Sequence, residues 1–241
     1  QVHDTLAGFG IESLDALQHR AMTVHTQKRR LDVRKPPRRI VLLSRVTIGA
    51  DVAILTVMIP RLTRLFPKAD IVVIGDPKLR GLLDGHPAVR LRELNYARRG
   101  GLFERFSAWY AVLDIVRAET PAGGEQDLLV IDPDSRLTQL GVLPLVHNDN
   151  YLFFNTRDPA LSATGRCMAE LTNDWIDAVF DVPDFHYPTL WIAPALLATA
   201  GRRVEQLRAA GARRIIAVNF GFGGNALKQL GPEFEKRLVQ P

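Results

Sequence analysis

The fold is decided by residues 39–75, which read RIVLLSRVTIGADVAILTVMIPRLTRLFPKADIVVIG. Residues 39–44 form a compact aliphatic run, which is typical of a strand buried on both faces of a parallel sheet. A turn containing Gly49 follows, and apolar residues then recur at helical spacing until Pro67 ends the helix. Residues 69–75 read as a second buried strand. A strand, a glycine turn, a helix and another strand form a βαβ unit, which predicts a Rossmann-like α/β sheet.

The same alternation continues along the chain and predicts one domain over residues 39–187. The pattern indicates further strands at 89–94, 127–132 and 151–155, and helices at 78–84, 102–118 and 160–180. The proline-punctuated stretch 182–194 predicts a linker.

Residues 188–241 predict the opening of a second Rossmann-like domain. A helix is expected at 195–210, a buried strand at 213–219, and a further helix that starts near Pro232. A sheet with one strand cannot bury both of its faces, so we expect this second domain to be incomplete within these residues.

Bulk composition is that of a globular protein, with 46% apolar and 24% charged residues among 241. No apolar run reaches the roughly 18 residues that a membrane-spanning helix needs. A single cysteine, Cys167, excludes an internal disulfide and fits a reducing compartment, so we expect a cytoplasmic protein.

Residues 1–38 predict a helical arm that carries much of the positive charge. Residues 1–39 hold eight basic and four acidic side chains, 8 − 4 = +4, of a total of +5 for the chain. Such an arm suits contact with an anionic surface, such as a membrane face or a partner, or it is only a solvated tether. No recognisable module for nucleic acid follows it.

The loop after the first strand places Asp51 at the start of a helix. Ligands of open parallel sheets bind at the carboxyl ends of the strands, where this loop lies. An ionised carboxylate held there by backbone N–H groups can accept a proton from a sugar hydroxyl. The alternative is that Asp51 only caps the helix.

The loop after the fourth strand reads DPDSRLTQ over residues 132–139. Asp132 and Asp134 are expected in a polar loop that binds an acceptor, with Arg136 as the side chain for an anionic group. Two alternatives remain: a plain turn, for which Asp-Pro-Asp-Ser is a common sequence, or a site for Mg²⁺ or Mn²⁺.

A third loop, residues 219–228, follows the strand expected at 213–219 and is rich in glycine. Backbone N–H groups of such a loop can approach a phosphate, and Lys228 can neutralise a diphosphate leaving group. The alternative is a surface lysine beside a tight turn. The candidate phosphate-binding residues are Lys228, Gly221, Gly223, Gly224 and Asn225.

Residues 44–67, SRVTIGADVAILTVMIPRLTRLFP, resemble the opening of the bacterial heptosyltransferase family. In that family a strand, a Gly-Asp turn, a helix and a Phe-Pro pair precede the next strand. The aspartate of the turn is the family's proposed general base, which implies that role for Asp51. This sequence departs from the pattern by the insertion of Ala50 between Gly49 and Asp51, and by a displaced Pro60.

The resemblance extends loosely over residues 39–241. The stretch that begins at Lys228 and leads to Pro232-Glu233 is similar, with one extra residue, to the family's phosphate-contacting lysine before a Pro-Glu helix start. Further acceptor contacts are assigned to Thr47 and Gly49.

The resemblance implies a GT-B fold and an inverting transfer of a heptose-like sugar without a metal or other cofactor. The implied donor is a nucleotide sugar such as ADP-heptose, and the implied acceptor is a lipopolysaccharide core or related glycan. It further implies a place at the inner membrane, and no activity for these 241 residues alone. Two rivals remain: a metal-dependent GT-A enzyme using Asp132 and Asp134, and a non-catalytic scaffold or oligomerisation domain.

Overall fold

A computed structural model describes residues 1–97, 100–219 and 231–239. The chain divides into two compact units, residues 1–193 and residues 194–241, and each is described by itself. In the part of the chain that is described, no helix combines the length and the apolar character needed to cross a membrane.

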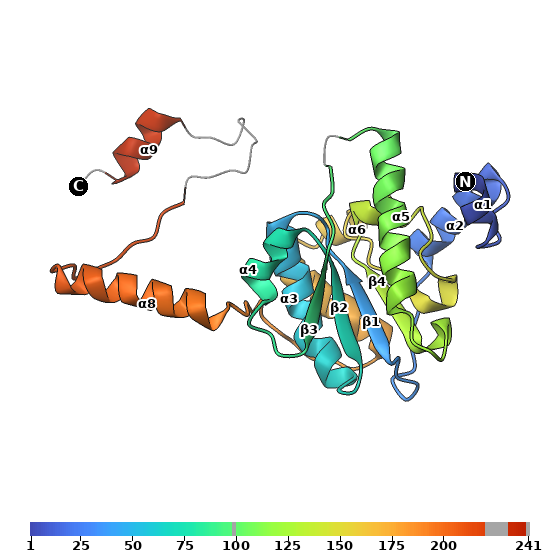
Figure 1. The fold of residues 1–241 in the computed structure, drawn as a ribbon, viewed down its shortest axis with the longest axis horizontal. Helices are drawn as coiled ribbons and strands as arrows, with labels where there is room; N and C mark the ends of the chain where they lie inside the picture. The colour runs from blue at the N-terminus through green and yellow to red at the C-terminus, as the bar shows by residue number, and fades with distance from the viewer. Residues whose placement is uncertain (98–99, 220–230, 240–241) are drawn as a thin grey trace. The chain divides into compact units, whose positions relative to one another are not determined.

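The first unit is built on a five-stranded parallel sheet with the order β3-β2-β1-β4-β5 (Figure 1). Strand β1 is central, and Val41 pairs with Val72 of β2 and with Val130 of β4. All five strands predicted for this unit are present. Their bounds are β1 Arg39–Leu43, β2 Asp70–Gly75, β3 Val89–Glu93, β4 Leu128–Asp132 and β5 Tyr151–Phe153.

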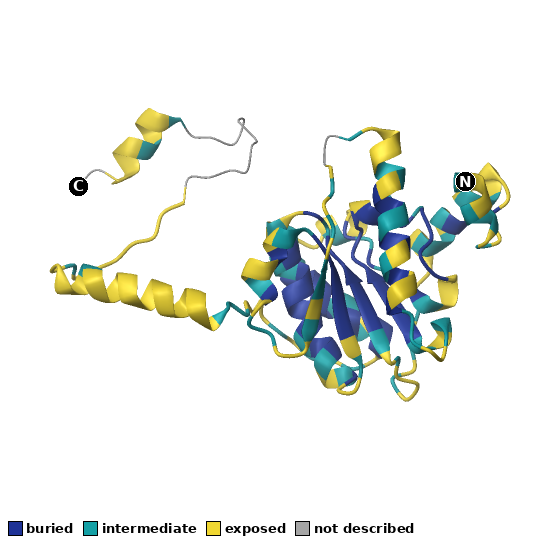
Figure 2. Ribbon diagram, viewed as in Figure 1, coloured by how far each residue is buried: buried dark blue, intermediate teal, exposed yellow. Residues whose placement is uncertain are grey.

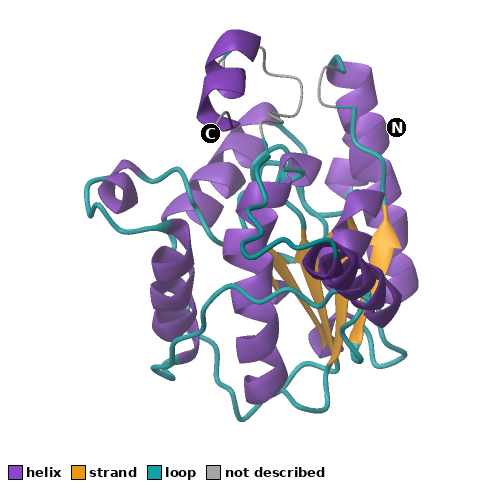
Figure 3. Ribbon diagram, turned by 90° about the vertical axis from the view of Figure 1, so that its left-hand side faces the viewer, coloured by secondary structure: helices purple, strands orange, loops and turns teal. Residues whose placement is uncertain are grey.

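Helices cover both faces of this sheet (Figure 3). Alternate side chains of β1 enter two separate apolar cores, since successive residues of a strand point to opposite faces. Ile40 and Leu42 pack in the core that contains α3 and α7, whereas Val41 and Leu43 pack in the core that contains α5. The α-helices of this unit are α1 Val2–Ala7, α2 Leu14–Thr26, α3 Ile48–Leu65, α4 Arg80–Leu83, α5 Leu102–Glu119, α6 Pro159–Ser162 and α7 Met168–Phe180.

Short 3-10 turns complete the connections, and one predicted helix is divided. The 3-10 turns are η1 Pro77–Leu79, η2 Glu125–Asp127, η3 Arg136–Thr138 and η4 Asn148–Asn150. The helix expected over 160–180 becomes α6 and α7, because Gly165 between them adopts a φ of +67° that a helix cannot contain.

The basic arm packs on the sheet unit, which differs from the expected separate region 1–38 and from a solvated tether. Arg20 of α2 is 7% exposed and donates to the carbonyl of Gly141 at 2.7 Å. Arg29 donates to the carbonyl of Tyr151, at the edge of the sheet, at 3.2 Å. Each guanidinium is therefore occupied by an internal contact, and part of the arm's charge serves to dock it.

The second unit contains α8 Pro194–Ala209 and α9 Pro232–Val239, close to the helices predicted there. The strand predicted at 213–219 does not form, and Ile215, Ile216 and Val218 are 43%, 81% and 53% exposed. A strand needs a neighbour to satisfy its backbone N–H and C=O groups, and no second strand lies among the described residues of this unit. The prediction of a strand was therefore wrong, although the apolar pattern that suggested it is real.

Candidate functional site

The loops that follow β1 and β4 meet at the carboxyl edge of the sheet. Ser135 donates its hydroxyl hydrogen to the carbonyl of Ser44, and Arg45 pairs with Asp134 at 3.2 Å. Strands β1 and β4 are neighbours, so the loops that leave them lie side by side. The two loops singled out in the sequence thus form one polar region at the edge where ligands of parallel sheets bind.

Asp51 is almost fully buried within this region. It lies in the first turn of α3, and its side chain is 1% exposed. Its carboxylate accepts from the hydroxyl of Ser44 and from the backbone N–H of Arg45, each at 2.8 Å. Burial raises the pKa of Asp51 to about 6, although these two hydrogen bonds and a third from the backbone of Thr47 act in the opposite direction.

The hydrogen bonds of Asp51 show which part of the loop between β1 and α3 its carboxylate holds in place. The residue that precedes the helix is Thr47, which makes no side-chain cap bond, and Asp51 lies a full turn further on. Its hydrogen bonds run back to Ser44 and Arg45 and to the backbone N–H of Thr47, so Asp51 ties the end of β1 to the start of α3. A carboxylate with a pKa near 6 is ionised for the most part at neutral pH, and it can accept a proton there.

The loop between β1 and α3 contains backbone strain that the sequence did not reveal. Val46 adopts a φ of +62°, and its N–H donates to the Ser44 hydroxyl at 2.8 Å. A β-branched residue in the left-handed region is a genuine outlier, and such outliers concentrate at functional sites. The neighbouring strand supports the loop closely, because a Cβ at Gly75 would lie 2.5 Å from the Cβ of Ser44.

Asp132 has a pKa similar to that of Asp51, but different groups surround its carboxylate. It is fully buried and accepts from the backbone N–H of Ser135 at 2.6 Å and from the hydroxyls of Thr138 and Tyr151. Burial raises the pKa of Asp132 to about 6. These donors come from its own loop and from the start of β5, so Asp132 folds the turn 132–138 onto the sheet.

Asp134 is the meeting point of three loops. Its carboxylate pairs with Arg45 from the loop after β1 and with Arg157 from the segment after β5. Thr156 also donates its hydroxyl to Asp134, at 2.8 Å. Asp134 itself adopts a φ of +62°, a left-handed conformation that aspartate tolerates better than most residues.

Positive charge exceeds negative charge around Asp134. The side chains of Arg45 and Arg157 are 15% and 45% exposed. Arg136, on the same loop as Asp134, is also exposed. Burial lowers the pKa of Arg45, and the nearby charges of Arg157 and Arg136 lower it further, while Asp134 and Asp51 raise it. Two guanidinium groups pair with Asp134, and the exposed Arg136 adds a third positive charge, so the region is suited to an anion.

The structure places each remaining predicted residue as follows. Thr47 and Gly49 are exposed at the start of α3, and a Cβ at Gly49 would meet nothing within 4 Å. The space beside Gly49 is therefore open. The predicted phosphate-binding residues Lys228, Gly221, Gly223, Gly224 and Asn225 lie outside the described residues. No group of three His, Cys, Asp or Glu side chains that could hold a metal lies in the described part of the chain.

Sequence reasoning missed Arg45, Thr156 and Arg157. The signal for the last two was present, since a polar Asn-Thr-Arg-Asp run at 155–158 follows the predicted fifth strand. A polar run after a strand marks the ligand-binding edge of a parallel sheet. That the three loops converge on Asp134 depends on the strand order, which the sequence pattern did not specify.

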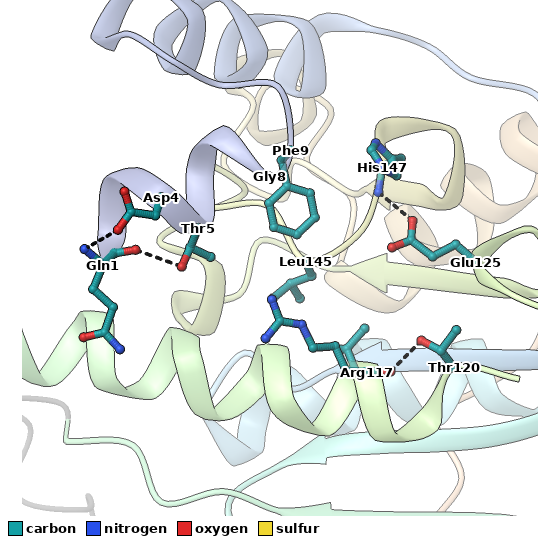
Figure 4. A pocket seen from close by; sticks show the side chains of 11 residues that line it. Gln1, Asp4, Thr5, Gly8, Phe9, Arg117, Thr120, Glu125, Leu145 and His147 are labelled. Atoms are coloured by element: carbon teal, nitrogen blue, oxygen red, sulfur yellow. Dashed lines mark hydrogen bonds and ion pairs between the residues drawn. The ribbon is translucent and has the colours of Figure 1, made fainter.

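Two cavities lie away from Asp51. One, of about 890 Å³, lies between residues 24–30, β5 and α7. The other, of about 490 Å³, lies between α1 and the last turn of α5, where Phe9 and Leu145 are flanked by Glu125 and His147 (Figure 4). In this second cavity the backbone N–H of His147 donates to the Glu125 carboxylate at 3.1 Å. Neither cavity includes the carboxylates at the ends of β1 and β4.

Comparison with known proteins identifies the fold. No protein-family model and no curated protein matches the sequence. A solved structure, the glycosyl transferase family 9 protein from Veillonella parvula, is similar with a TM-score of 0.52 and 15% sequence identity. The fold of this chain is therefore similar to part of that glycosyl transferase. The similarity covers 74% of this chain and 51% of that one, so the chain spans about half the length of this relative.

This match confirms the predicted α/β fold class, with the parallel sheet of a GT-B glycosyltransferase. An identity of 15% establishes the fold alone. Function must therefore be argued from the residues at the carboxyl edge.

Proposed function

We propose that residues 1–193 form the acceptor-binding half of a metal-independent, inverting glycosyltransferase. The observation that carries this proposal is the buried Asp51, with a pKa of about 6, beside a cluster of arginines at the carboxyl edge of the sheet. The fold shared with a family 9 glycosyl transferase supports the same assignment.

In this proposal Asp51 is the general base. Its ionised carboxylate takes the proton of an acceptor hydroxyl as the oxygen attacks the anomeric carbon of the donor sugar. A base works best when its pKa lies near the working pH, and burial places Asp51 in that range. Asp51 is 1% exposed, so an acceptor hydroxyl would have to displace the Ser44 hydroxyl or enter from the open side at Gly49.

The arginine cluster would hold an anionic group of the acceptor. Arg136 is exposed, and Arg45 and Arg157 are oriented by Asp134, so a phosphate or carboxylate near them would gain charge-assisted hydrogen bonds. A lipopolysaccharide core sugar has this character. Thr47 is exposed beside the same loop and is placed to contact a sugar hydroxyl.

The donor is proposed to be a nucleotide sugar such as ADP-heptose, whose diphosphate leaves from the anomeric carbon. Lys228 and the glycine-rich residues before it remain our candidates for that diphosphate. The whole reaction is proposed to need no metal, because Asp132 and Asp134, the residues of the rival metal site, are already committed to internal contacts. Asp132 is fully enclosed by hydroxyl and N–H donors, and Asp134 is paired with two arginines.

The test is transfer from ADP-heptose to a lipopolysaccharide core oligosaccharide by the natural full-length protein, followed by mass spectrometry. We expect a glycosylated product whose yield is unchanged by EDTA, and inverted stereochemistry at the new bond. Loss of product on chelation with recovery in Mn²⁺ would assign the reaction to the metal-dependent rival. The absence of transfer with every nucleotide sugar tried would favour the non-catalytic scaffold.

The acceptor side can be tested separately by titrating this chain with glucosamine 1-phosphate and with glucosamine. We expect the phosphorylated sugar to shift the amide signals of residues 44–51 and 134–136 in NMR spectra, and the neutral sugar to shift them much less. Arg157→Ala should weaken the effect, whereas Arg202→Ala, an exposed arginine of α8, should not.

A further inference from the structure

The first turn of α5 carries two large apolar side chains that the protein does not cover. Leu102 and Phe103 are 64% and 87% exposed, and Phe103 is the most exposed large apolar residue in the described part of the chain. The later part of α5 is well packed, since Trp109, Val112 and Leu113 are fully buried. The exposure is therefore confined to the end of the helix.

The position of this turn explains why it is uncovered. Leu102 lies seven residues, or about two turns, before Trp109, so both side chains are on the same face of the helix. Trp109 is fully buried on that face, and Leu102 is not. Figure 1 shows the start of α5 projecting beyond the carboxyl ends of the strands, and Figure 2 shows exposed residues at that end. The sheet that buries the helix ends before its first turn begins.

The charge next to this turn is positive. Residues 98–105 contain three arginines, Arg98, Arg99 and Arg105, and one acidic residue, Glu104. Arg105 donates to the neutral side-chain amide of Gln139 at 3.0 Å. Gln139 belongs to the loop that also carries the exposed Arg136, so the apolar turn lies beside the basic region of the carboxyl edge.

We propose that the first turn of α5 is a docking tip for an anionic lipid bilayer, with Leu102 and Phe103 entering the interface beside the positive charge of the carboxyl edge. Apolar side chains next to basic ones are the combination that such surfaces bind, and each adds to the affinity independently. A protein partner fits less well, because a stable interface needs about 800 Å² from each side and one projecting helical turn offers only a part of that.

This tip is distinct from the basic arm as a membrane-contacting element. Arg20 and Arg29 of the arm donate to carbonyl groups of the sheet unit. The tip, in contrast, has its apolar side chains exposed and lies at the edge where the acceptor is proposed to bind. A lipid-linked acceptor would then reach the site from the surface to which the protein is docked, although docking itself does not depend on the reaction.

The experiment is co-sedimentation of this chain with phosphatidylcholine vesicles that contain phosphatidylglycerol, and with vesicles of phosphatidylcholine alone. The double variant Leu102→Ser/Phe103→Ser is compared with Leu14→Ser, which removes an equally exposed apolar side chain (77%) from the arm. We expect the wild type to bind the anionic vesicles, the double variant to lose about tenfold in partition coefficient, and Leu14→Ser to bind as the wild type does. Raised salt should weaken binding.

Three results would overturn the proposal. In the first, the wild type fails to bind anionic vesicles, and in the second, the double variant binds them as well as the wild type does. The third result is that Leu14→Ser loses as much vesicle binding as the double variant. If the wild type ignores vesicles but changes from an oligomer to a monomer on Leu102→Ser/Phe103→Ser, the tip is instead a contact between copies of the chain. As a control, each variant should have the same melting temperature as the wild type, which would show that the fold is unaltered.

Discussion

The loops after β1 and β4 each bury an aspartate whose pKa is raised to about 6, yet the two residues are placed for different tasks. Asp132 is enclosed by donors from its own turn and by the hydroxyl of Tyr151. Asp51 accepts from Ser44, Arg45 and Thr47, all in the segment between β1 and α3, where Thr47 and Gly49 are exposed and the space beside Gly49 is open. Burial raises the pKa in both cases, and what distinguishes the two carboxylates is the exposed backbone next to Asp51.

The two loops can also be compared in how they are held. Both loops are held by hydrogen bonds to a buried carboxylate, and both contain non-glycine residues with a positive φ. These residues are Val46 after β1, and Asp134, Gln139 and Leu140 after β4. The β-branched Val46 tolerates this conformation least, which places marked backbone strain in the loop that Asp51 holds.

Replacing Asp51 should affect catalysis far more than replacing Asp132. We expect Asp51→Asn to lower kcat by about 10²- to 10⁴-fold, the usual contribution of a general base. Asp132→Asn should lower the free energy of unfolding and leave most of the turnover per folded molecule. Steady-state kinetics of the full-length protein, normalised to folded protein by circular dichroism, checks both. Near-normal kcat in Asp51→Asn would remove the base assignment.

Stability should depend on pH through Asp51 in a defined direction. The pKa of Asp51 is about 6 in the folded protein, against an ordinary value of 3.8 for an aspartate side chain. Because the folded state binds the proton more tightly, the stability associated with this group is present at low pH. It is lost as the pH rises from about 4 to about 6, for a total of about 3 kcal/mol.

Urea unfolding at several pH values, with Asp51→Asn as the reference, isolates this contribution, because Asp132 titrates in both proteins. The free energy of unfolding of the wild type should fall relative to that of the variant as the pH rises through this window. Parallel curves for the two proteins would mean that Asp51 has an ordinary pKa.

The support of the loop after β4 should depend on the hydroxyl of Tyr151. Tyr151→Phe leaves the buried Asp132 with one donor fewer, which should cost about 1–3 kcal/mol of unfolding free energy. Tyr110→Phe is the matched control, since the Tyr110 hydroxyl is engaged only at 3.5 Å, by Thr5, and should matter little. If the two substitutions lower the free energy of unfolding equally, the hydrogen bond from Tyr151 to Asp132 does not stabilise this loop.

The smallest effect is expected at Gly49. The space beside it is open, so Gly49→Ala should fold normally and gain up to about 1 kcal/mol from helix propensity. If an acceptor sugar approaches there, the added methyl group should raise KM while the melting temperature holds or rises. A lower melting temperature with an unchanged KM would instead show that Gly49 is needed for the start of α3 to fold, and not for access of the acceptor.

Much of the sheet unit could be predicted from the sequence. The runs 39–44, 69–75 and 127–132 are aliphatic and short, and each became a strand, because a sheet buried on both faces requires such runs. The run at 213–219 has the same composition and formed no strand. The apolar pattern of a segment shows that it can be buried. Whether it forms a strand depends on a neighbouring strand with which it can pair, and the local sequence does not show that neighbour.

The site was predictable only in part. Asp51, Asp134 and Arg136 could be placed at the carboxyl edge, because polar residues after buried strands mark the ligand-binding edge, and their roles there stay predictions. Arg45, Thr156 and Arg157 were missed, because their convergence on Asp134 requires the order β1-β4-β5. The docking of the arm was also missed, since Arg20 and Arg29 bond to backbone carbonyls that no side-chain pattern reveals.

The most direct test of the central claim is a carbon-13 NMR titration of the Asp51 side-chain carboxyl group, assigned by the loss of its signal in Asp51→Asn. We expect a titration midpoint of about 6, with the carboxylate mostly ionised at neutral pH and able to take up a proton. A midpoint near the ordinary value of 3.8 would contradict this expectation, because Asp51 would then be a solvated or charge-paired acid with little strength as a base.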